Sequence, residues 1–161
     1  MTLRTPLSGL ECPMARALDV LGDPWALMIL REVFTGNRRF DGLKDELAIA
    51  DTVLSKRLRA LVEAGLLRRV PYGGSVRPRV EYALTDAGSD TLPVLNALSQ
   101  WGTRHTESPT GGWNLRIECL KCGQVSESAD WCRTCAAPLD RGNTGWRRAG
   151  DPQRLISLAA R

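Results

Sequence analysis

The chain has 161 residues, which is room for one ordinary domain with a small appendage. Its 43% hydrophobic and 25% charged residues match the average of globular proteins and exclude wholesale disorder and a fibrous repeat. The net charge of +4 is mildly basic, and no apolar stretch reaches the roughly 20 residues needed to cross a bilayer. Because the start of the chain also lacks an apolar signal core, we expect a cytoplasmic protein that contacts no membrane.

Amphipathic patterning predicts a series of short helices over the first part of the chain. Pro13 suits the first position of a helix, and Gly22 with Pro24 breaks it. The next segment is apolar on almost every side, which is typical of a helix buried at the centre of a domain. We expect helices at about residues 13–21, 25–34, 40–47 and 51–64. Only residues 48–50 separate the last two, and so tight a join indicates a helix-turn-helix.

The pattern changes after residue 65 to one of strands. Residues 66–70 and 79–84 are typical of strands, with a Gly-rich turn at 71–75. Thr85-Asp86 then caps a helix that runs to about His105. The apolar stripe of this helix consists of Leu92, Leu95, Leu98 and Trp101. This order predicts a mainly α fold with a small β-hairpin wing, the winged helix-turn-helix.

The fourth predicted helix carries the residues that we expect to bind DNA. Its leucines share an inward stripe, which leaves a polar set pointing outward. The side chains of this set, which can reach base edges and phosphates in a major groove, are Thr52, Ser55, Lys56 and Arg59. Residues 51–80 hold seven basic side chains against two acidic ones, and Arg77 and Arg79 belong to the predicted wing. A merely solvated face is the plain alternative. Because Ala50 offers no side-chain cap, we expect Asp51 or Thr52 to cap this helix.

An ordered string of motifs resembles one family of regulators. The string begins at Cys12-Pro13 and continues through residues 22–30, 39–43, 53–61, 64–66 and 80–88. It resembles the HxlR-type winged helix-turn-helix transcription regulators over about Glu11 to Trp101. The resemblance implies a homodimer, paired through the first and last helices of the winged helix domain, on double-stranded DNA with a roughly palindromic operator. By the same analogy we expect a repressor.

Two C-x-x-C pairs in the last third of the chain predict a metal site. The four thiolates, a tetrahedral set that structural zinc prefers, come from Cys119, Cys122, Cys132 and Cys135. The pairs are similar to short zinc-ribbon modules, with Gly123 after the first pair and Ala136 where the second usually has Gly. A short segment with few apolar side chains could hardly fold without metal, so we expect structural Zn²⁺. Redox-labile zinc, an iron–sulfur cluster and no metal are the alternatives.

Cys12 stands apart from these pairs, immediately before the first predicted helix. The positive end of a helix favours a reactive thiolate, and some HxlR-type regulators are similar in using a cysteine here to sense oxidants or electrophiles. A small buried hydrophobe is the alternative. The single histidine, His105, has no partner for catalysis and is expected at the surface or at a helix end.

These observations divide the chain into a winged helix domain at 11–105, a linker at 106–112, a four-cysteine zinc-ribbon-like module at 113–139 and a basic tail at 140–161. We expect a sequence-specific transcription regulator, with a redox or effector response left open. The alternative is a protein–protein adaptor that docks through the winged helix and the zinc ribbon. The chain lacks a phosphate-binding loop, a Ser/His/Asp set and paired carboxylates, so we do not expect an enzyme.

Overall fold

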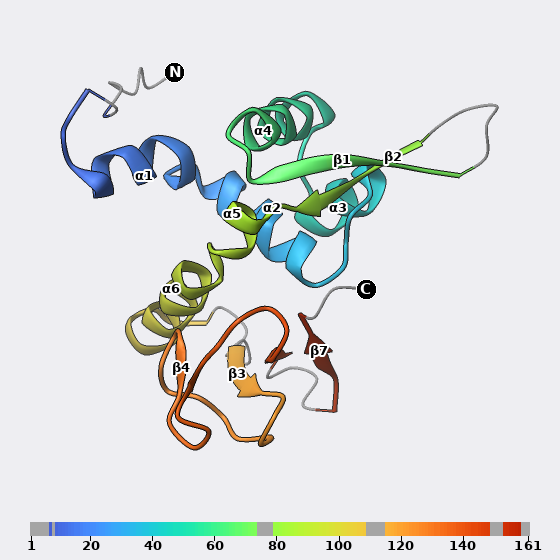
Figure 1. Cartoon of the computed structure of the whole chain (residues 1–161). Helices are drawn as coiled ribbons and strands as arrows, with labels where there is room; N and C mark the ends of the chain where they lie inside the picture. The colour runs from blue at the N-terminus through green and yellow to red at the C-terminus, as the bar shows by residue number, and fades with distance from the viewer. Residues whose placement is uncertain (1–6, 8, 74–78, 109–114, 149–152, 159–161) are drawn as a thin grey trace. The chain divides into compact units, whose positions relative to one another are not determined.

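The computed structural model describes residues 7, 9–73, 79–108, 115–148 and 153–158 (Figure 1). The chain divides into two compact units. The first unit comprises residues 1–33 and 37–85, and the second comprises residues 34–36 and 86–161. Among the described residues, no helix combines the length and the apolar character needed to cross a membrane.

Helices of the first unit enclose a core of aliphatic side chains. They are α1 (Pro13–Leu21), α2 (Pro24–Phe34), α3 (Phe40–Leu47) and α4 (Asp51–Glu63), close to the predicted ranges. Helix α2 supplies Ile29 and Leu30, both fully buried, as its continuous apolar character predicted. Leu43 of α3 and Leu54 of α4 are equally inaccessible to water. Burial of these side chains is the main stabilising contribution to this unit.

A tight turn joins α3 to α4. Ala48 ends α3 in the left-handed conformation, with φ +48°, and its N–H donates to the carbonyl of Lys44. Ala50 is the N-cap of α4 and makes no side-chain cap, so the expectation that Asp51 or Thr52 caps the helix is wrong. Asp51 instead forms an ion pair with Lys44 of α3 at 2.8 Å, since its carboxylate lies one residue inside the helix. The turn is therefore held by backbone geometry and by a charge pair across it.

The predicted wing is an antiparallel hairpin of β1 (Leu67–Tyr72) and β2 (Arg79–Leu84). Figure 1 shows α4 beside this hairpin, and α4 contacts β1. The outer edge of β2 is also paired, because the N–H of Tyr82 donates to the carbonyl of Arg38 at 2.8 Å and Arg39 forms a β-bridge with Glu81. The predicted turn at 71–75 extends beyond the described residues, which stop at 73 and resume at 79.

One long helix was predicted from residue 86 to His105, but the structure has two. Helix α5 (Asp86–Ser89) ends before α6 (Leu92–His105) begins. Pro93 lies in the first turn of α6 and has no N–H to donate to the carbonyl four residues earlier, so it cannot continue α5. The hydroxyl of Thr91 donates to the carbonyl of Gly88 at 2.6 Å and closes the break. Both helices belong to the second unit.

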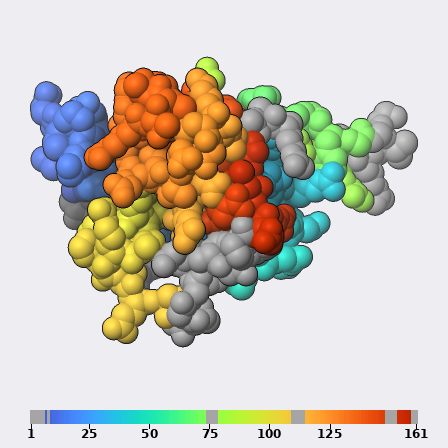
Figure 2. Space-filling model, turned by 90° about the horizontal axis from the view of Figure 1, so that it is seen from below, coloured from blue at the N-terminus to red at the C-terminus, as the bar shows by residue number. Residues whose placement is uncertain are grey.

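The second unit holds a small sheet as well as the paired cysteines. Strands β3 (Leu115–Cys119), β6 (Thr144–Arg148) and β7 (Leu155–Ser157) form an antiparallel sheet in the order β3-β6-β7. A short hairpin pairs β4 (Trp131–Cys132) with β5 (Ala137–Pro138). In Figure 2 the orange and red residues of these strands form one continuous body.

The separate basic tail predicted at residues 140–161 is therefore wrong for its described part. Strand β6 pairs along the whole of β3, and Trp146 is only 2% exposed. The ring of Trp146 lies 5.9 Å from that of Phe34, the α2 residue that belongs to this unit. Arg147 makes two hydrogen bonds with the carboxylate of Glu118, of 2.5 and 3.0 Å. The arginines of this segment suggested a solvated tail in the sequence. In the structure Arg147 is neutralised by Glu118 of β3, so the segment can form a strand.

Candidate nucleic-acid interface and metal centre

Helix α4 separates a buried apolar face from an exposed polar one. Leu54, Leu58 and Leu61 are at most 2% exposed and recur at helical spacing, so they fix the rotation of the helix about its axis. The exposed side chains are those predicted to contact DNA, namely Thr52, Ser55, Lys56 and Arg59. The arrangement presents two hydroxyls and two cations from one rigid element.

Arg57 of the same helix is directed to a structural partner. Its guanidinium forms an ion pair of 2.7 Å with Oδ2 of Asp23. Oδ1 of Asp23 accepts hydrogen bonds from the N–H groups of Trp25 and Ala26, at 3.0 and 3.3 Å, and so caps the start of α2. One carboxylate thus anchors α4 to the beginning of α2. Sequence reasoning counted Arg57 only as positive charge, and this pairing has no signal in the local sequence.

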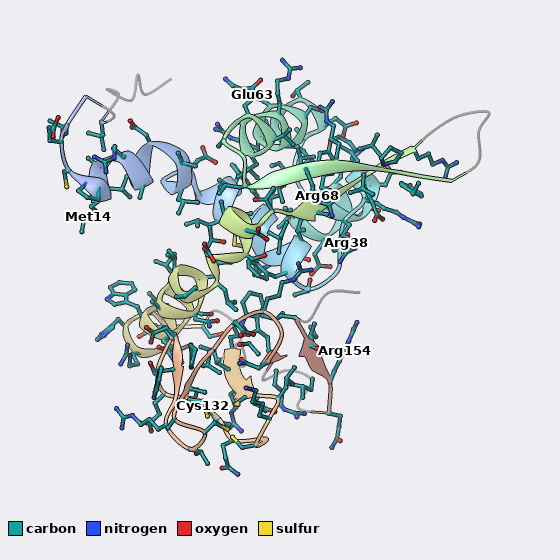
Figure 3. All side chains as sticks on the ribbon, viewed as in Figure 1. Met14, Arg38, Glu63, Arg68, Cys132 and Arg154 are labelled. Carbon is teal, nitrogen blue, oxygen red and sulfur yellow. The ribbon has the colours of Figure 1, made fainter. Side chains whose placement is uncertain are left out.

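The wing adds further exposed arginines. Arg68, Arg69 and Arg79 are exposed on β1 and β2, and Figure 3 labels Arg68 on the hairpin. The predicted contact residue Arg77 lies outside the described residues. Arg39, which sequence reasoning missed, stacks its guanidinium 4.5 Å from the ring centroid of Tyr72. Helix α4 and the wing therefore place basic side chains on one unit, as the sequence predicted from their charge.

The four paired cysteines converge in the second unit. All four Sγ atoms lie within 4.8 Å of one another. The Sγ atoms of Cys119 and Cys135 are 3.8 Å apart, and those of Cys122 and Cys132 are 3.6 Å apart. These separations are too long for disulfides, and all four thiols are free. The sulfur atoms beside the labelled Cys132 are visible in Figure 3.

The observed spacing fits a tetrahedral metal ion. Four Zn–S bonds of about 2.3 Å in a tetrahedron place neighbouring sulfurs about 3.8 Å apart, close to the 3.8 and 3.6 Å separations of the two pairs. Gly123 has φ +70°, a left-handed conformation that glycine adopts readily, and its N–H donates to the carbonyl of Cys119 at 2.8 Å. Ala136 takes the corresponding conformation at φ +46°, although it carries a Cβ. The four cysteines could therefore hold a metal ion.

The thiols differ strongly in their readiness to lose a proton. Burial opposes ionisation of Cys119, but hydrogen bonds from the backbone of Cys122 and Lys121 outweigh it and lower the pKa of Cys119 to about 7. Its thiolate in turn opposes a second ionisation nearby. Hydrogen bonding to Cys122, together with burial and the proximity of Cys119, raises the pKa of Cys135 to about 12. A cation is needed to stabilise four thiolates at once.

Cys12 is exposed and occupies the N-cap position of α1, where it makes no side-chain cap. It is therefore not the buried hydrophobe considered as an alternative. His105 ends α6 and is exposed, with its ring 5.3 Å from that of Trp101. Neither residue joins the cysteine cluster, which consists of the four paired cysteines.

Two helices carry apolar side chains that water reaches. On α1 and just before it, Leu10, Met14 and Leu18 are 42–71% exposed. On α6, Val94, Leu98 and Trp101 follow one another at helical spacing and are 42–57% exposed. The predicted stripe of α6 is thus divided, because Leu92 and Leu95 are buried whereas Leu98 and Trp101 are not.

Comparison with known sequences identifies relatives across most of the chain. The model of the HxlR-like helix-turn-helix family matches residues 20–110. The HTH-type transcriptional regulator Rv3095 of Mycobacterium tuberculosis is 39% identical over 130 residues, which cover 81% of each chain. The HTH-type transcriptional regulator sll1512 of Synechocystis is 39% identical over 97 residues, covering 60% of this chain and 71% of the relative. These relatives are regulators and not enzymes, as the sequence predicted.

Solved structures share the fold. The crystal structure of PA1607, a candidate transcription factor, is 36% identical with a TM-score of 0.69, and covers 84% of this chain and 93% of that one. The reduced form of the redox regulator HypR is 29% identical with a TM-score of 0.55, and covers 60% of this chain and 95% of that one. The similarity to PA1607 is long enough to extend beyond residues 20–110.

Proposed function

We propose, from the premise that this chain belongs to the HxlR-like helix-turn-helix family, that it binds double-stranded DNA sequence-specifically through α4. The observation that carries the proposal is the division of α4 into a buried leucine face and an exposed set of Thr52, Ser55, Lys56 and Arg59. In a major groove the cations reach guanine acceptors or phosphates, and the hydroxyls reach either.

The wing contributes sequence-independent contacts in this proposal. Arg79 and the neighbouring exposed arginines would neutralise phosphates beside the groove that α4 enters. Arg77 is retained in the proposed contact set on the sequence alone. Stacking of Arg39 on Tyr72 reduces the freedom that its side chain would lose on binding, so it supports a phosphate contact there.

We propose that the protein acts as a homodimer, with the first and last helices of the winged helix domain at the interface. The exposed apolar faces of α1 and α6 support this assignment, because such faces are normally covered. Two copies of α4 would then read half-sites about one DNA turn, roughly 34 Å, apart. Occupation of a promoter by such a dimer represses by excluding other proteins.

We propose that the four cysteines hold Zn²⁺ in a structural role. The 3.6 and 3.8 Å sulfur separations support zinc, and four protein ligands leave no coordination position open for catalysis. Bound zinc supplies a cross-link between the turn after β3 and the β4-β5 hairpin. Elemental analysis of the purified protein tests this proposal, with one zinc per chain expected.

Cys12 is the proposed oxidant sensor. Its exposure supports access by small oxidants, and a structural relative is named a redox regulator. Mild oxidation should change the affinity of the unaltered protein for DNA and leave Cys12→Ser unchanged. An equal response in both proteins would assign any redox sensitivity to other thiols.

The DNA-binding proposal is tested on the duplex selected by the protein from random sequences. Lys56→Ala combined with Arg59→Ala should weaken binding at least tenfold, since each base or phosphate contact is worth about 1–3 kcal/mol. The slope of log affinity against log salt should also fall by up to about 2. Arg116→Ala with Arg154→Ala removes the same charge from the second unit, away from α6, and should leave the affinity unchanged. Equal affinity of the α4 variant and the unaltered protein would contradict the proposal and favour a protein-docking role.

A further inference from the structure

An open apolar groove of about 630 Å³ lies along α6 in the second unit. One wall is the exposed face of α6, which includes Val94, Leu98 and Trp101. The other wall is Ala129 with Asp130, from the loop that leads into β4. The groove is therefore built from a helix of the winged helix domain and from the segment that carries the second cysteine pair.

A buried amide ties these two walls together. Nδ2 of Asn96 donates to the carbonyl of Ala129 at 2.7 Å, and Oδ1 of Asn96 accepts from Nε1 of Trp146 at 2.9 Å. Asn96 is fully buried, so loss of either bond would leave a polar group without water to replace it. Hydrogen bonds to α6 and β6 thus hold the Ala129 end of this loop, whereas its other end leads to Cys132.

The same loop is linked directly to the cysteine cluster. Ala129 is three residues before Cys132, and the carbonyl of Asp130 accepts a hydrogen bond from the N–H of Leu139 at 2.7 Å. Oγ of Ser126 donates to the carbonyl of Trp131 at 2.9 Å, which holds the start of β4. A metal that cross-links Cys132 to the turn after β3 would fix the end of this loop. Without the metal, the thiols of the two segments make weak sulfur contacts of 3.6 and 3.8 Å in place of metal bonds.

The occupant that best fits the groove is a second copy of this chain. Helix α1 presents an apolar face of its own, and Met14 on it is 71% exposed. The ends of the two helices differ in charge, since Glu11 precedes α1 whereas Arg104 and His105 end α6. In a twofold dimer, α1 of each copy would fill the groove of the other, so the contact would form twice and would cover the apolar faces of both copies.

We propose that metal binding by the four cysteines controls self-association, because it sets the position of the loop that forms one wall of this groove. The inference rests on the proposed homodimer and the proposed zinc site, and adds the coupling between them. It makes the second unit a device by which metal supply, or oxidation of the thiols, changes the dimer that binds DNA.

Sedimentation equilibrium of the full chain under reducing conditions tests the coupling, with zinc supplied in one sample and removed by chelator in the other. The dimer dissociation constant should rise about tenfold on removal, within the usual range of coupling between two sites. The same dissociation constant with and without zinc would overturn the inference and leave the homodimer intact. A monomer in both samples would instead contradict the proposed homodimer.

Two variants separate the groove from the metal. Asn96→Ala should keep one zinc per chain yet weaken the dimer, whereas Gln100→Ala on the same helix should not. Full zinc with an unchanged dimer in Asn96→Ala would overturn the inference.

Leu98→Asp places a charge on an exposed residue of the groove and should abolish the dimer at any zinc concentration. Val80→Asp on β2, where the side chain is 39% exposed against 48% for Leu98, is its control and should leave the dimer unchanged.

Discussion

The two units each contain a short turn beside their candidate functional side chains, but they hold those turns in different ways. In the first unit, the helices on either side of the α3–α4 turn bury aliphatic side chains such as Leu43 and Leu54. In the second unit, the cysteine turns rest on a small sheet, hydrogen bonds and four thiols. The α3–α4 turn is thus supported by apolar packing together with a charge pair, whereas we expect a segment with little apolar content to need a bound ion.

Metal removal should give the largest effect and should fall on one unit only. Structural zinc contributes apparent binding free energies of about 10 kcal/mol or more in small modules, so chelation should loosen β3 to β6. Fluorescence of the buried Trp146 should change, while the helical signal of α1 to α4 should remain. Equal loss of structure in both units would show that the first unit depends on the metal as much as the second.

The same experiment has a defined dependence on pH. Zinc binds thiolates, and the thiol of Cys119 with its lowered pKa of about 7 is deprotonated above that pH and protonated below it. Protons therefore compete more strongly as the pH falls through about 7, and zinc affinity should decrease. Transfer of zinc to a chromophoric chelator, followed at several pH values, measures this decrease. Affinity that is constant across this interval would contradict the thiolate assignment.

Truncation of a core leucine should affect the other unit. Leu58→Ala removes a side chain that is 1% exposed and should lower the free energy of unfolding by about 2–5 kcal/mol. The zinc content should stay at one per chain, because Leu58 belongs to the first unit. Lys56→Ala, on the exposed face of the same helix, should change stability by less than about 0.5 kcal/mol. Urea denaturation of the three proteins provides the comparison.

Trp146→Phe should give a smaller loss, confined to the second unit. The substitution keeps an aromatic ring beside Phe34 but removes the donor to Oδ1 of Asn96. A buried acceptor left without its donor costs about 1–3 kcal/mol. Trp131→Phe, at a position that is 44% exposed, should be nearly neutral. Thermal unfolding with zinc present would distinguish the two variants, and equal effects would remove Asn96 from the explanation.

The smallest expected effect is shared by both units. Ala48 and Ala136 have φ values of +48° and +46°, a conformation that disfavours a Cβ. Ala48→Gly and Ala136→Gly should each stabilise the protein by about 0.5–1 kcal/mol, after allowance for the greater freedom of glycine in the unfolded chain. Ala60→Gly within α4 should have the opposite sign, because helical φ gives glycine no advantage. Destabilisation by all three would show that the turns are not strained.

The sequence predicted the first unit well because its signals are local and periodic. The leucine spacing of α4 defined both the helix and its exposed face, and residues 51–63 form it as predicted to within one residue. The cysteine cluster was equally accessible, since two short spacings were enough to indicate four ligands. Pro93 was the missed local signal, because an otherwise continuous apolar stripe concealed the break between α5 and α6.

The rest of the second unit could not be predicted because its contacts join distant positions. Asn96 and Trp146 are 50 residues apart, and the strand that carries Trp146 has one glycine and two arginines among its five residues. The pair of Glu118 with Arg147 is likewise visible only in three dimensions. Residues whose contacts lie close by in the sequence were therefore placed correctly. The contacts of Asn96, Trp146 and Arg147, which join distant positions, were not predicted.

The pairing of β6 with β3 also limits how far the chain can be shortened while the second unit keeps its sheet. A fragment that stops at residue 139 would keep every cysteine of the cluster, yet it would remove the neighbour of β3 and the indole that fills the space beside Asn96. Such a fragment would expose Ile117 to water and would present an unpaired strand edge, a common starting point for aggregation. Cleavage in this region should thus disrupt the second unit and leave α4 chemically intact.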